Sequence, residues 1–282
     1  MTRRRFLWLV GAALSMVGLG WVYMKYVEAA WLEVTRKRVR LGKGTANALR
    51  ILHLSDFHAS EDVPFELIEK AIHLGLREKP DLICLTGDFI SKALPDPGRY
   101  ASILSRLVEK APTYASMGNH DGGPWVAKRG GFQSSSNMEA VLDAAGIRVL
   151  RNEALNLTVA GQKVCLVGMG DLWNRDVDTE KAFGNRKRDG ATVVLSHNPD
   201  SRWRLEGEDW DLMLCGHTHG GQLIVPLFGT RPFVPIEDPA FSEGLIPWKG
   251  RLIHVTRGVG NLHGMRFNCR PEVSLLELEG NA

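Results

Sequence analysis

Short apolar segments that end in polar clusters constrain the fold of this chain more than any other feature of its sequence. Arg50 to Leu54, Asp81 to Leu85 and Thr113 to Met117 have the apolar character of buried strands. Phe65 to Glu78 and Tyr100 to Glu109 lie between them and repeat apolar residues at helical spacing. This alternation predicts strand–helix–strand units in the first half of the chain.

The second half keeps the strands and loses most of the helices. Eight further strands are expected, at residues 148–150, 155–159, 163–168, 192–196, 212–215, 222–225, 252–256 and 273–278. Such elements bury their apolar faces by packing in layers. We therefore predict an α+β fold in which two mixed β-sheets pack together with helices outside.

Five polar clusters stand at or just after the ends of predicted strands, and they hold five of the nine histidines. In Asp-x-His and His-x-His, two side chains one residue apart on an extended segment can face one cleft. One such cluster alone is a weak signal, but together they supply seven N and O donors without a thiolate, a set suited to two hard-to-borderline divalent cations. The clusters are Asp56-Phe57-His58, Gly87-Asp88, Gly118-Asn119-His120-Asp121, His197-Asn198 and Gly216-His217-Thr218-His219.

This series resembles that of the calcineurin-like metallophosphoesterase family, a resemblance that covers residues 49–279. The strings Leu-Ser-Asp-Phe-His (54–58), Leu-Thr-Gly-Asp-Phe (85–89) and Leu-Cys-Gly-His-Thr-His-Gly-Gly-Gln (214–222) are similar to its membrane-associated bacterial YaeI/YkuE-type branch. Ser-His-Asn-Pro-Asp, Thr-Arg-Gly-Val-Gly and Cys-Arg-Pro-Glu-Val, which begin at residues 196, 256 and 269, extend the match. Many relatives have a glycine where this chain has Ala59-Ser60. The resemblance implies a four-layer α/β-β/α sandwich with a dinuclear metal site at strand ends.

The resemblance also implies a role for each polar residue. Divalent cations (Mn, Fe, Zn or Mg) would occupy two positions, and a bridging hydroxide would attack phosphorus in line. His120 would protonate the leaving group and Asp121 would orient His120. By position, Asp56, His58 and His219 hold one metal, Asn119, His197 and His217 hold the other, and Asp88 bridges them.

Two segments are candidates for contacting substrate. The Gly-rich stretch from Gly122 to Gly131 offers Trp125 to an apolar or ring surface, and Lys128 and Arg129 to an anionic group. Asp171-Leu172-Trp173-Asn174-Arg175 is a second segment of similar character. Arg257, in the later glycine-containing segment, is a further candidate. The alternative for each is an ordinary surface loop.

An uncharged apolar run extends from Phe6 to Met24. Its 19 residues, as a helix rising about 1.5 Å per residue, match the hydrocarbon core of a bilayer, about 30 Å thick. A buried helix of the globular domain is the alternative. We divide the chain into an N-terminal membrane anchor (1–25), a basic connector (26–48) and a metallophosphoesterase domain (49–282), and expect the bacterial inner membrane as its location.

The two flanks of this run give opposite orientations. Met-Thr-Arg-Arg-Arg-Phe-Leu, at residues 1–7, resembles a twin-arginine signal, which would make the twin-arginine translocase a partner and export the domain. The downstream flank carries six Lys or Arg residues against three upstream, which favours a cytoplasmic domain. Cleavage near Glu28-Ala29-Ala30 stays open, although an uncleaved anchor is preferred.

Charge separates the two parts of the chain. Residues 1–43 hold nine basic and two acidic side chains, a net charge of +7, and the whole chain carries +3, which leaves −4 for the remainder. The positive charge is therefore concentrated at one end, and a general nucleic-acid surface is excluded.

The anchor beside a phosphoesterase site predicts a lipid-linked phosphoester substrate at the membrane surface. The resemblance includes enzymes that split UDP-2,3-diacylglucosamine into lipid X and UMP in lipid A synthesis. The alternatives are an exported phosphoesterase with another phosphodiester substrate, and a non-enzymatic, metal-stabilised scaffold. Retention of all seven donors and of His120 argues against the scaffold.

Overall fold

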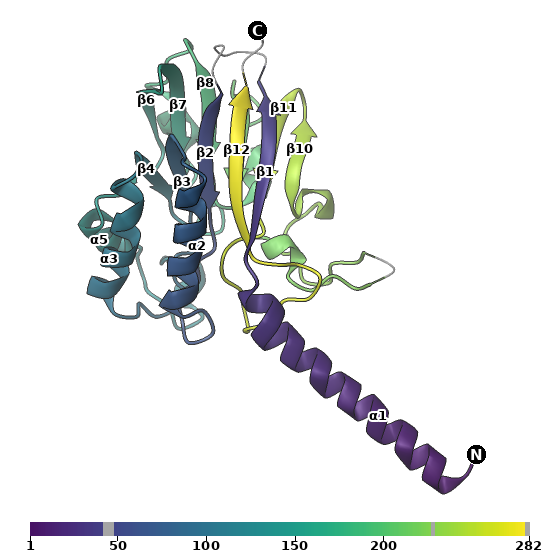
Figure 1. Cartoon of the computed structure of the whole chain (residues 1–282). Helices are drawn as coiled ribbons and strands as arrows, with labels where there is room; N and C mark the ends of the chain where they lie inside the picture. The colour runs from purple at the N-terminus through teal and green to yellow at the C-terminus, as the bar shows by residue number, and fades with distance from the viewer. Residues whose placement is uncertain (42–47, 227–228, 280–282) are drawn as a thin grey trace.

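The protein is built around two six-stranded mixed β-sheets, seen in a computed structural model that describes residues 1–41, 48–226 and 229–279. The first sheet has the order β1 (Glu33–Arg40), β12 (Glu272–Glu279), β2 (Leu49–Leu54), β3 (Leu82–Thr86), β4 (Thr113–Ser116), β5 (Arg148–Val149). The second has the order β10 (Gly244–Trp248), β11 (Arg251–Val255), β9 (Leu212–Cys215), β8 (Ala191–Leu195), β7 (Gln162–Gly168), β6 (Glu153–Val159). The predicted pair of packed mixed sheets is confirmed (Figure 1).

The central strands of each sheet are parallel. β2 to β5 form one parallel set, and β7, β8, β9 and β11 form the other. Antiparallel pairings join β12 to β2, β6 to β7 and β10 to β11. Because parallel strands end at the same edge of a sheet, the polar clusters that follow β2, β3, β4, β8 and β9 gather at one end of the molecule.

Helices cover the outer face of the first sheet. They are α2 (Phe65–Arg77), α3 (Pro97–Val108) and α5 (Ser136–Ala144), with the short α4 (Pro124–Ala127) in a loop near the site. Ile68 and Ile72 of α2 pack in the same apolar cluster as Leu52 of β2. The spacing of these residues along α2 places them on one helical face, while Glu66 and Arg77 complement the helix dipole at its two ends.

The interface between the sheets is a second apolar cluster. Ile51 and Leu276 of the first sheet meet Leu166, Val193 and Leu212 of the second. Along β2, Ile51 faces the other sheet while Leu52 faces the helices, as the alternation of side chains along a strand requires. The outer face of the second sheet is covered by α6 (Thr179–Phe183), by 3-10 turns and by Trp210 and Trp248.

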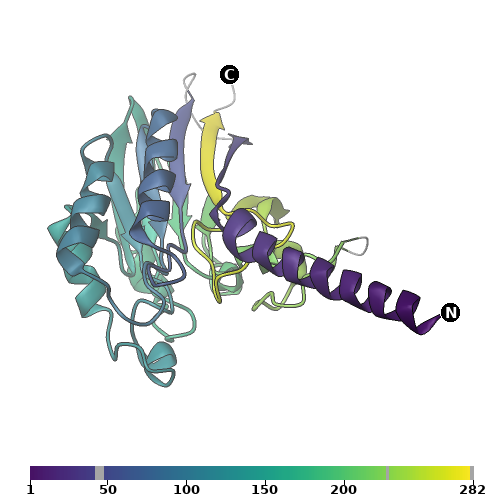
Figure 2. The same ribbon diagram turned by 60° about the horizontal axis from the view of Figure 1, so that its bottom comes forward.

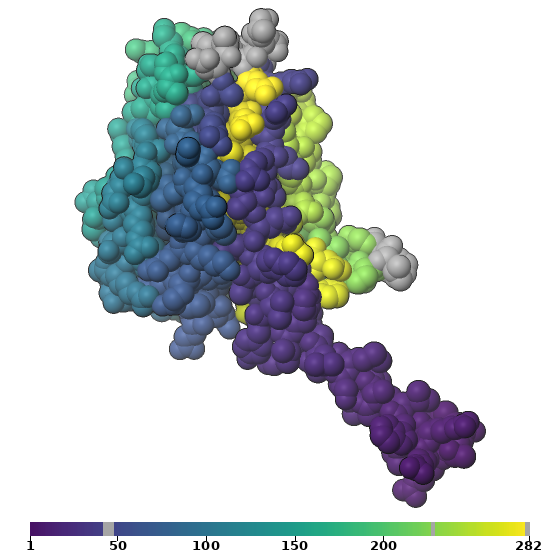
Figure 3. All heavy atoms as spheres, in the orientation of Figure 1, coloured from purple at the N-terminus to yellow at the C-terminus, as the bar shows by residue number. Residues whose placement is uncertain are grey.

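The N-terminal helix α1 (Arg3–Val22) extends away from this body, and a π-helical turn (Tyr23–Val27) and a 3-10 turn (Glu28–Ala30) continue it. No residue of α1 itself is buried, whereas Glu28 and Ala29 of the 3-10 turn are. The helical stretch Arg3–Ala30 is long and apolar enough to cross a membrane. Figures 1 and 3 show it projecting from the end of the domain opposite the C-terminus.

Two sequence predictions about the elements are wrong. The connector at residues 26–48 contains β1, which pairs in parallel with β12 from Glu33 to Arg40. Its charged side chains hid this edge strand, since four of its eight residues are Lys or Arg and they face solvent or ion-pair with Glu277 and Glu279. Residues 222–225 form one isolated bridge, Leu223 to Phe267, instead of a strand.

Candidate metal centre

The candidate site lies where the carboxyl ends of both parallel strand sets meet, the edge at which open α/β sheets bind ligands. Five of the seven predicted ligands have a positive φ that non-glycine residues seldom adopt. Such backbone strain persists where the surrounding structure holds it, and it clusters at functional sites. The five are Asp56, His58, Asp88, His217 and His219.

Glycines allow these turns to approach one another. Gly87 has a φ of +79°, and a Cβ atom there would collide with the backbone of Gly118. A Cβ atom on Gly216 would collide with the Ser55 hydroxyl and the Asp56 carboxylate. The Gly-Asp and Gly-His patterns therefore bring the chain close enough for side chains from different strands to meet.

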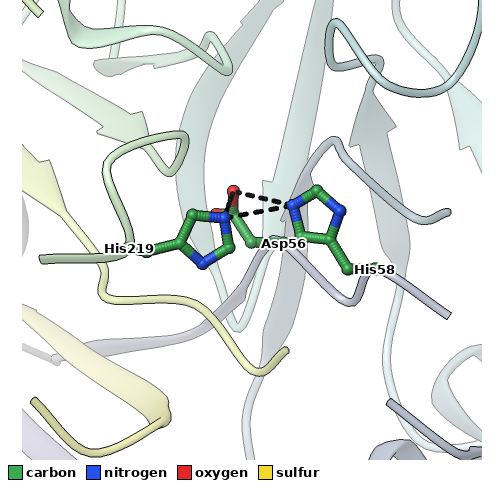
Figure 4. Close-up of side chains that lie close together, drawn as sticks. All are labelled: Asp56, His58 and His219. Atoms are coloured by element: carbon green, nitrogen blue, oxygen red, sulfur yellow. Dashed lines mark hydrogen bonds and ion pairs between the residues drawn. The ribbon is translucent and has the colours of Figure 1, made fainter. Parts of the chain in front are cut away.

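The first group of candidate ligands is Asp56, His58 and His219 (Figure 4). Nε2 of His58 lies 3.1 Å from Nε2 of His219, and Oδ1 of Asp56 lies 3.5 Å from the His219 nitrogen and 4.0 Å from the His58 nitrogen. All three side chains are buried. Two imidazole nitrogens and a carboxylate that converge in this way form a donor set for a divalent cation.

The second group is Asp88, His197 and His217. Nε2 of His197 lies 3.1 Å from Oδ2 of Asp88 and 3.2 Å from Nδ1 of His217. Nδ1 of His197 donates to the carbonyl of Thr86 at 2.7 Å, which orients the ring and turns Nε2 toward the site. Oδ2 of Asp88 also lies 3.4 Å from Nε2 of His58, so Asp88 stands between the two groups.

Asn119 provides the test of whether a cation fits. It is buried beside Asp88, and among the described residues neither its Oδ1 nor its Nδ2 has a hydrogen-bond partner. Nε2 of His217 has none either. Buried polar atoms without partners are costly, and a cation at the second group would take the Asn119 oxygen as a ligand. The residues present therefore fit divalent cations.

The protonation states of the histidines agree with this role. Burial lowers the pKa of His58 to about 3 and that of His217 to about 3, so both rings are neutral at pH 7, as metal ligation requires. Burial also acts to lower the pKa of His197, but the adjacent Asp88 carboxylate raises it to about 10. Without a cation, His197 and Asp88 thus form a buried ion pair whose proton a cation would displace.

His120 lies at the edge of this centre. Its Nδ1 is 2.6 Å from the carbonyl oxygen of Ser91, which only accepts, so Nδ1 is the donor. Its backbone N–H donates to Oδ1 of Asp88 at 2.8 Å, and its ring centroid lies 4.8 Å from that of His58. This arrangement leaves Nε2 available to a reacting group.

Asp121 has different partners from those expected. Its carboxylate accepts from the backbone N–H groups of Gly118 at 2.8 Å, Asp88 at 2.9 Å and Phe89 at 2.6 Å. The carbonyl of Ser91, and not Asp121, holds His120. These three hydrogen bonds let Asp121 fix the turn that presents Asp88, while burial, with the adjacent Asp88 carboxylate, raises the pKa of Asp121 to about 8.

A pocket of about 420 Å³ opens beside the candidate ligands. Asp88, Asn119, His120, His217 and His219 form its polar end. Its other walls are mainly apolar and aromatic: Trp125, Trp173, Leu223, Phe233, Pro235, Leu262 and Met265. A phosphoester that bears an apolar group matches this division.

The predicted substrate residues are only partly in this pocket. Trp125 lines it, whereas the guanidinium of Arg129 packs 4.1 Å from the Trp125 ring, and Lys128 is not among the lining residues. Arg257 was expected at a wall, but its guanidinium is held by Glu33 at 2.8 Å and Glu272 at 3.1 Å. Arg257 thus fastens the N-terminal strand segment to β12.

Sequence reasoning missed most of the apolar lining. It did mark the segment at residues 171–175, whose Trp173 lines the pocket and approaches His217 at 4.3 Å between ring centroids. Phe233, Leu262 and Met265 lie in irregular segments without periodicity. No local signal indicates that such residues meet at one pocket.

The comparison with known proteins agrees with this geometry. Residues 49–221 match the family described as calcineurin-like phosphoesterase, and the chain belongs to that family of metal-dependent phosphoester hydrolases. Within it, the chain falls in the YaeI/YkuE-type branch. It is 44% identical over 280 residues to phosphodiesterase YaeI of Escherichia coli K12, with 99% of each chain covered.

Two more distant proteins are similar. The UDP-2,3-diacylglucosamine pyrophosphatase LpxG of Chlamydia trachomatis serovar D is 27% identical over 307 residues, with 92% of each chain covered. A 5'-nucleotidase precursor from Thermus thermophilus has a TM-score of 0.51 at 15% identity and covers 82% of this chain. This chain spans 55% of that structure, and the likeness concerns the fold alone.

Proposed function

We propose that this protein is a phosphodiesterase or pyrophosphatase that hydrolyses a lipid-linked phosphoester at a membrane surface, with two divalent cations in the site. One observation carries the proposal: a single pocket joins the two groups of candidate ligands to apolar walls from Leu223, Leu262 and Met265. The exposed apolar helix α1 supports a location at the inner membrane.

The proposed reaction assigns a task to each residue. Asp56, His58 and His219 would hold one cation, and Asn119, His197 and His217 the other, with Asp88 shared. Cations bound there supply an activated water and neutralise charge on the phosphoryl oxygens. His120 gives a proton from Nε2 to the leaving-group oxygen, and the Ser91 carbonyl holds its ring in place.

UDP-2,3-diacylglucosamine, cleaved to lipid X and UMP, is the first candidate substrate. The support is the similarity to LpxG, whose name states this activity, together with the apolar pocket. The second candidate is another phosphodiester, cleaved outside the cytoplasm by an exported enzyme. The Arg3-Arg4 motif, which resembles a signal for the twin-arginine translocase, favours this alternative.

A substrate comparison tests the lipid-linked claim. The full chain in detergent with Mn²⁺ would be assayed on UDP-2,3-diacylglucosamine, on UDP-N-acetylglucosamine and on bis-p-nitrophenyl phosphate. We expect kcat/KM for the diacylated substrate to exceed that for the unacylated one by about 100-fold, because remote apolar contacts supply transition-state binding. Equal values for the two would refute a lipid-linked substrate and leave the phosphoesterase class intact.

A wall variant refines this test. Leu262→Ser makes one apolar wall polar, away from the candidate metal ligands. It should lower kcat/KM for the diacylated substrate by about tenfold, since a half-buried leucine contributes only part of the roughly 1.5–3 kcal/mol that full burial of this side chain provides. A loss of the same size on bis-p-nitrophenyl phosphate would mean that the wall does not select the lipid.

A further inference from the structure

The base of α1 is fixed to the catalytic domain by buried hydrogen bonds. The backbone N–H of Arg266 donates to the carbonyl of Met24 at 3.1 Å. Four residues further on, the carboxylate of Glu28, which is 2% exposed, accepts from the backbone N–H of Cys269 at 2.6 Å. Met24 is the last residue of the uncharged run, so the chain around Arg266 lies where that apolar run ends.

The same chain segment forms a wall of the pocket. Leu262 and Met265 line the pocket directly, and Phe267 pairs with the neighbouring lining segment. Phe267 donates its N–H to the carbonyl of Gln222 at 3.0 Å and accepts from Ile224 at 2.9 Å. The apolar wall and the base of α1 are therefore parts of one hydrogen-bonded unit.

Two exposed apolar side chains continue this wall outward. Phe233 lines the pocket and is nonetheless 65% exposed, and Val225 is 39% exposed. Figures 1 and 2 show the segment that carries them, in light green, at the same end of the domain as α1. Exposed apolar side chains beside a pocket mark a surface for another apolar body.

Aromatic rings and cations surround the base of α1. The guanidinium of Arg270 lies 3.6 Å from the ring of Trp31, which is 46% exposed, and Nζ of Lys25 lies 5.6 Å from the ring of Trp21. Such rings and cations are favoured at the headgroup level of a bilayer. This belt lies at the same end of the domain as the hydrogen bond between Met24 and Arg266.

We propose that the lip, defined as Val225, Phe233, Trp31 and Arg270, rests in the headgroup region of the bilayer that α1 crosses. The occupant of this surface is lipid, because the lip lies at the end of the domain from which the apolar helix α1 projects and includes Trp31 and Arg270 of the belt described above. The inference rests on the proposed function, which places α1 in a membrane. Its consequence is a pocket that opens onto the bilayer, so a lipid can bring its phosphoester to the metal ligands while its chains remain in the membrane.

Site-specific labelling tests the lip. All four native cysteines are buried, so one introduced cysteine can carry a bimane fluorophore. The full chain would be labelled as Phe233→Cys, Trp203→Cys or Leu14→Cys and placed in phosphatidylcholine nanodiscs that contain lipids with a nitroxide near the headgroup and along the acyl chain. Trp203 is a matched control, since it is 47% exposed but packs against Trp248 and Lys249 at the β10–β11 hairpin.

We expect the nitroxide lipids to quench the labels at positions 14 and 233 at least threefold more than the label at position 203. Quenching at 14 with none at 233 would overturn the lip and leave the anchor intact. No quenching at any position would refute the membrane location on which the inference rests. A label at 233 shielded from both lipid and aqueous quenchers would overturn the lip in favour of a contact between protein molecules.

Discussion

Among single residues, His120 gives the sharpest chemical prediction, because it is the proposed general acid. If Nε2 protonates the leaving oxygen, His120→Gln should lower kcat by about 10²–10³ on an alkyl phosphodiester, the usual size of general acid catalysis. The loss on bis-p-nitrophenyl phosphate should be smaller, because p-nitrophenolate leaves without protonation. Steady-state kinetics on both substrates would measure this difference.

Metal analysis provides the control for this variant. Bound Mn²⁺ per chain should be unchanged in His120→Gln, since His120 lies outside the two proposed ligand sets. Losses of the same size on both substrates, or a loss of Mn²⁺, would assign His120 to positioning or ligation instead.

The buried pair His53 and His254 predicts how stability depends on pH. The Nδ1 atoms lie 3.0 Å apart, and burial holds the pKa of His53 well below its usual range and lowers that of His254 to about 4. Below pH 6.5 the unfolded chain takes up protons that the folded chain does not, so each ring costs up to about 1.4 kcal/mol of stability per pH unit. The melting temperature should therefore fall from pH 6.5 to about pH 4.

A substitution isolates this contribution. His254→Gln replaces the imidazole ring with an amide, which does not titrate. The decline in melting temperature between pH 6.5 and 4.5 should be shallower than in the wild type when both are measured by scanning calorimetry. Parallel declines would show that other groups control acid stability.

The side chains that gather in the candidate metal centre could be predicted from the sequence, and the roles of their neighbours could not. Asp56, His58 and His219 belong to short patterns whose spacing is itself a property of the site. The partners of Asp121 and Arg257 are set by backbone groups and carboxylates far away in the sequence, such as Glu33. Their roles depend on tertiary contacts that no local pattern encodes.

At the scale of elements, the junction between α1 and the domain yields a stability prediction. Glu28→Ala removes the acceptor of the buried Cys269 N–H and should cost about 1–3 kcal/mol, the usual penalty for an unsatisfied buried group. Because Cys269 also contacts the carbonyl of His219 through its sulfur at 3.1 Å, the variant should bind Mn²⁺ more weakly. Denaturant unfolding and Mn²⁺ titration of the full chain in detergent measure both effects.

Arg36→Ala is the matched control for Glu28→Ala. It removes an ion pair with Glu78 at 2.7 Å in the same N-terminal segment, but the arginine is exposed. Exposed pairs contribute less than about 1 kcal/mol. Equal destabilisation by the two substitutions, with unchanged Mn²⁺ affinity, would contradict a structural link between the junction and the site.

The elements differ in how well their sequence defines them. The buried parallel strands β2, β3 and β9 read as apolar runs, and their positions were predicted to within a residue or two. The edge strand β1 is covered with Lys and Arg, and such charges are how proteins protect an exposed sheet edge. The charged side chains that protect the edge of this strand also remove the apolar pattern from which a strand is predicted.

At the scale of the whole molecule, the N-terminal segment and the rest of the chain carry opposite net charges. The first 43 residues carry a net charge of +7, and the remainder carries −4. Arg3, Arg4, Arg5 and Lys25 flank the apolar run, where they can meet anionic lipid, whereas four other basic residues lie on β1 of the domain. Two bound cations would offset part of that acidity at the site. The positive charge of the whole chain is thus shared between the anchor and the edge strand β1.

The side of the membrane decides between the two candidate substrates. In cells that carry either the wild type or Arg3→Lys/Arg4→Lys, added protease should leave the domain intact if it is cytoplasmic and acts on a UDP-lipid. Spheroplast digestion followed by immunoblotting measures this. A domain that is degraded in wild-type spheroplasts and protected in the variant would establish export and exclude a cytoplasmic nucleotide substrate.

The central claim is that the two groups of ligands form one cation-dependent hydrolytic site. The most direct test is turnover of bis-p-nitrophenyl phosphate by the chelator-treated full chain as Mn²⁺ is added, beside Asp88→Asn. We predict no turnover without Mn²⁺, a plateau at two Mn²⁺ per chain, and neither full metal content nor turnover in Asp88→Asn. Undiminished turnover after chelation, or none with the site fully loaded with Mn²⁺, would contradict the claim.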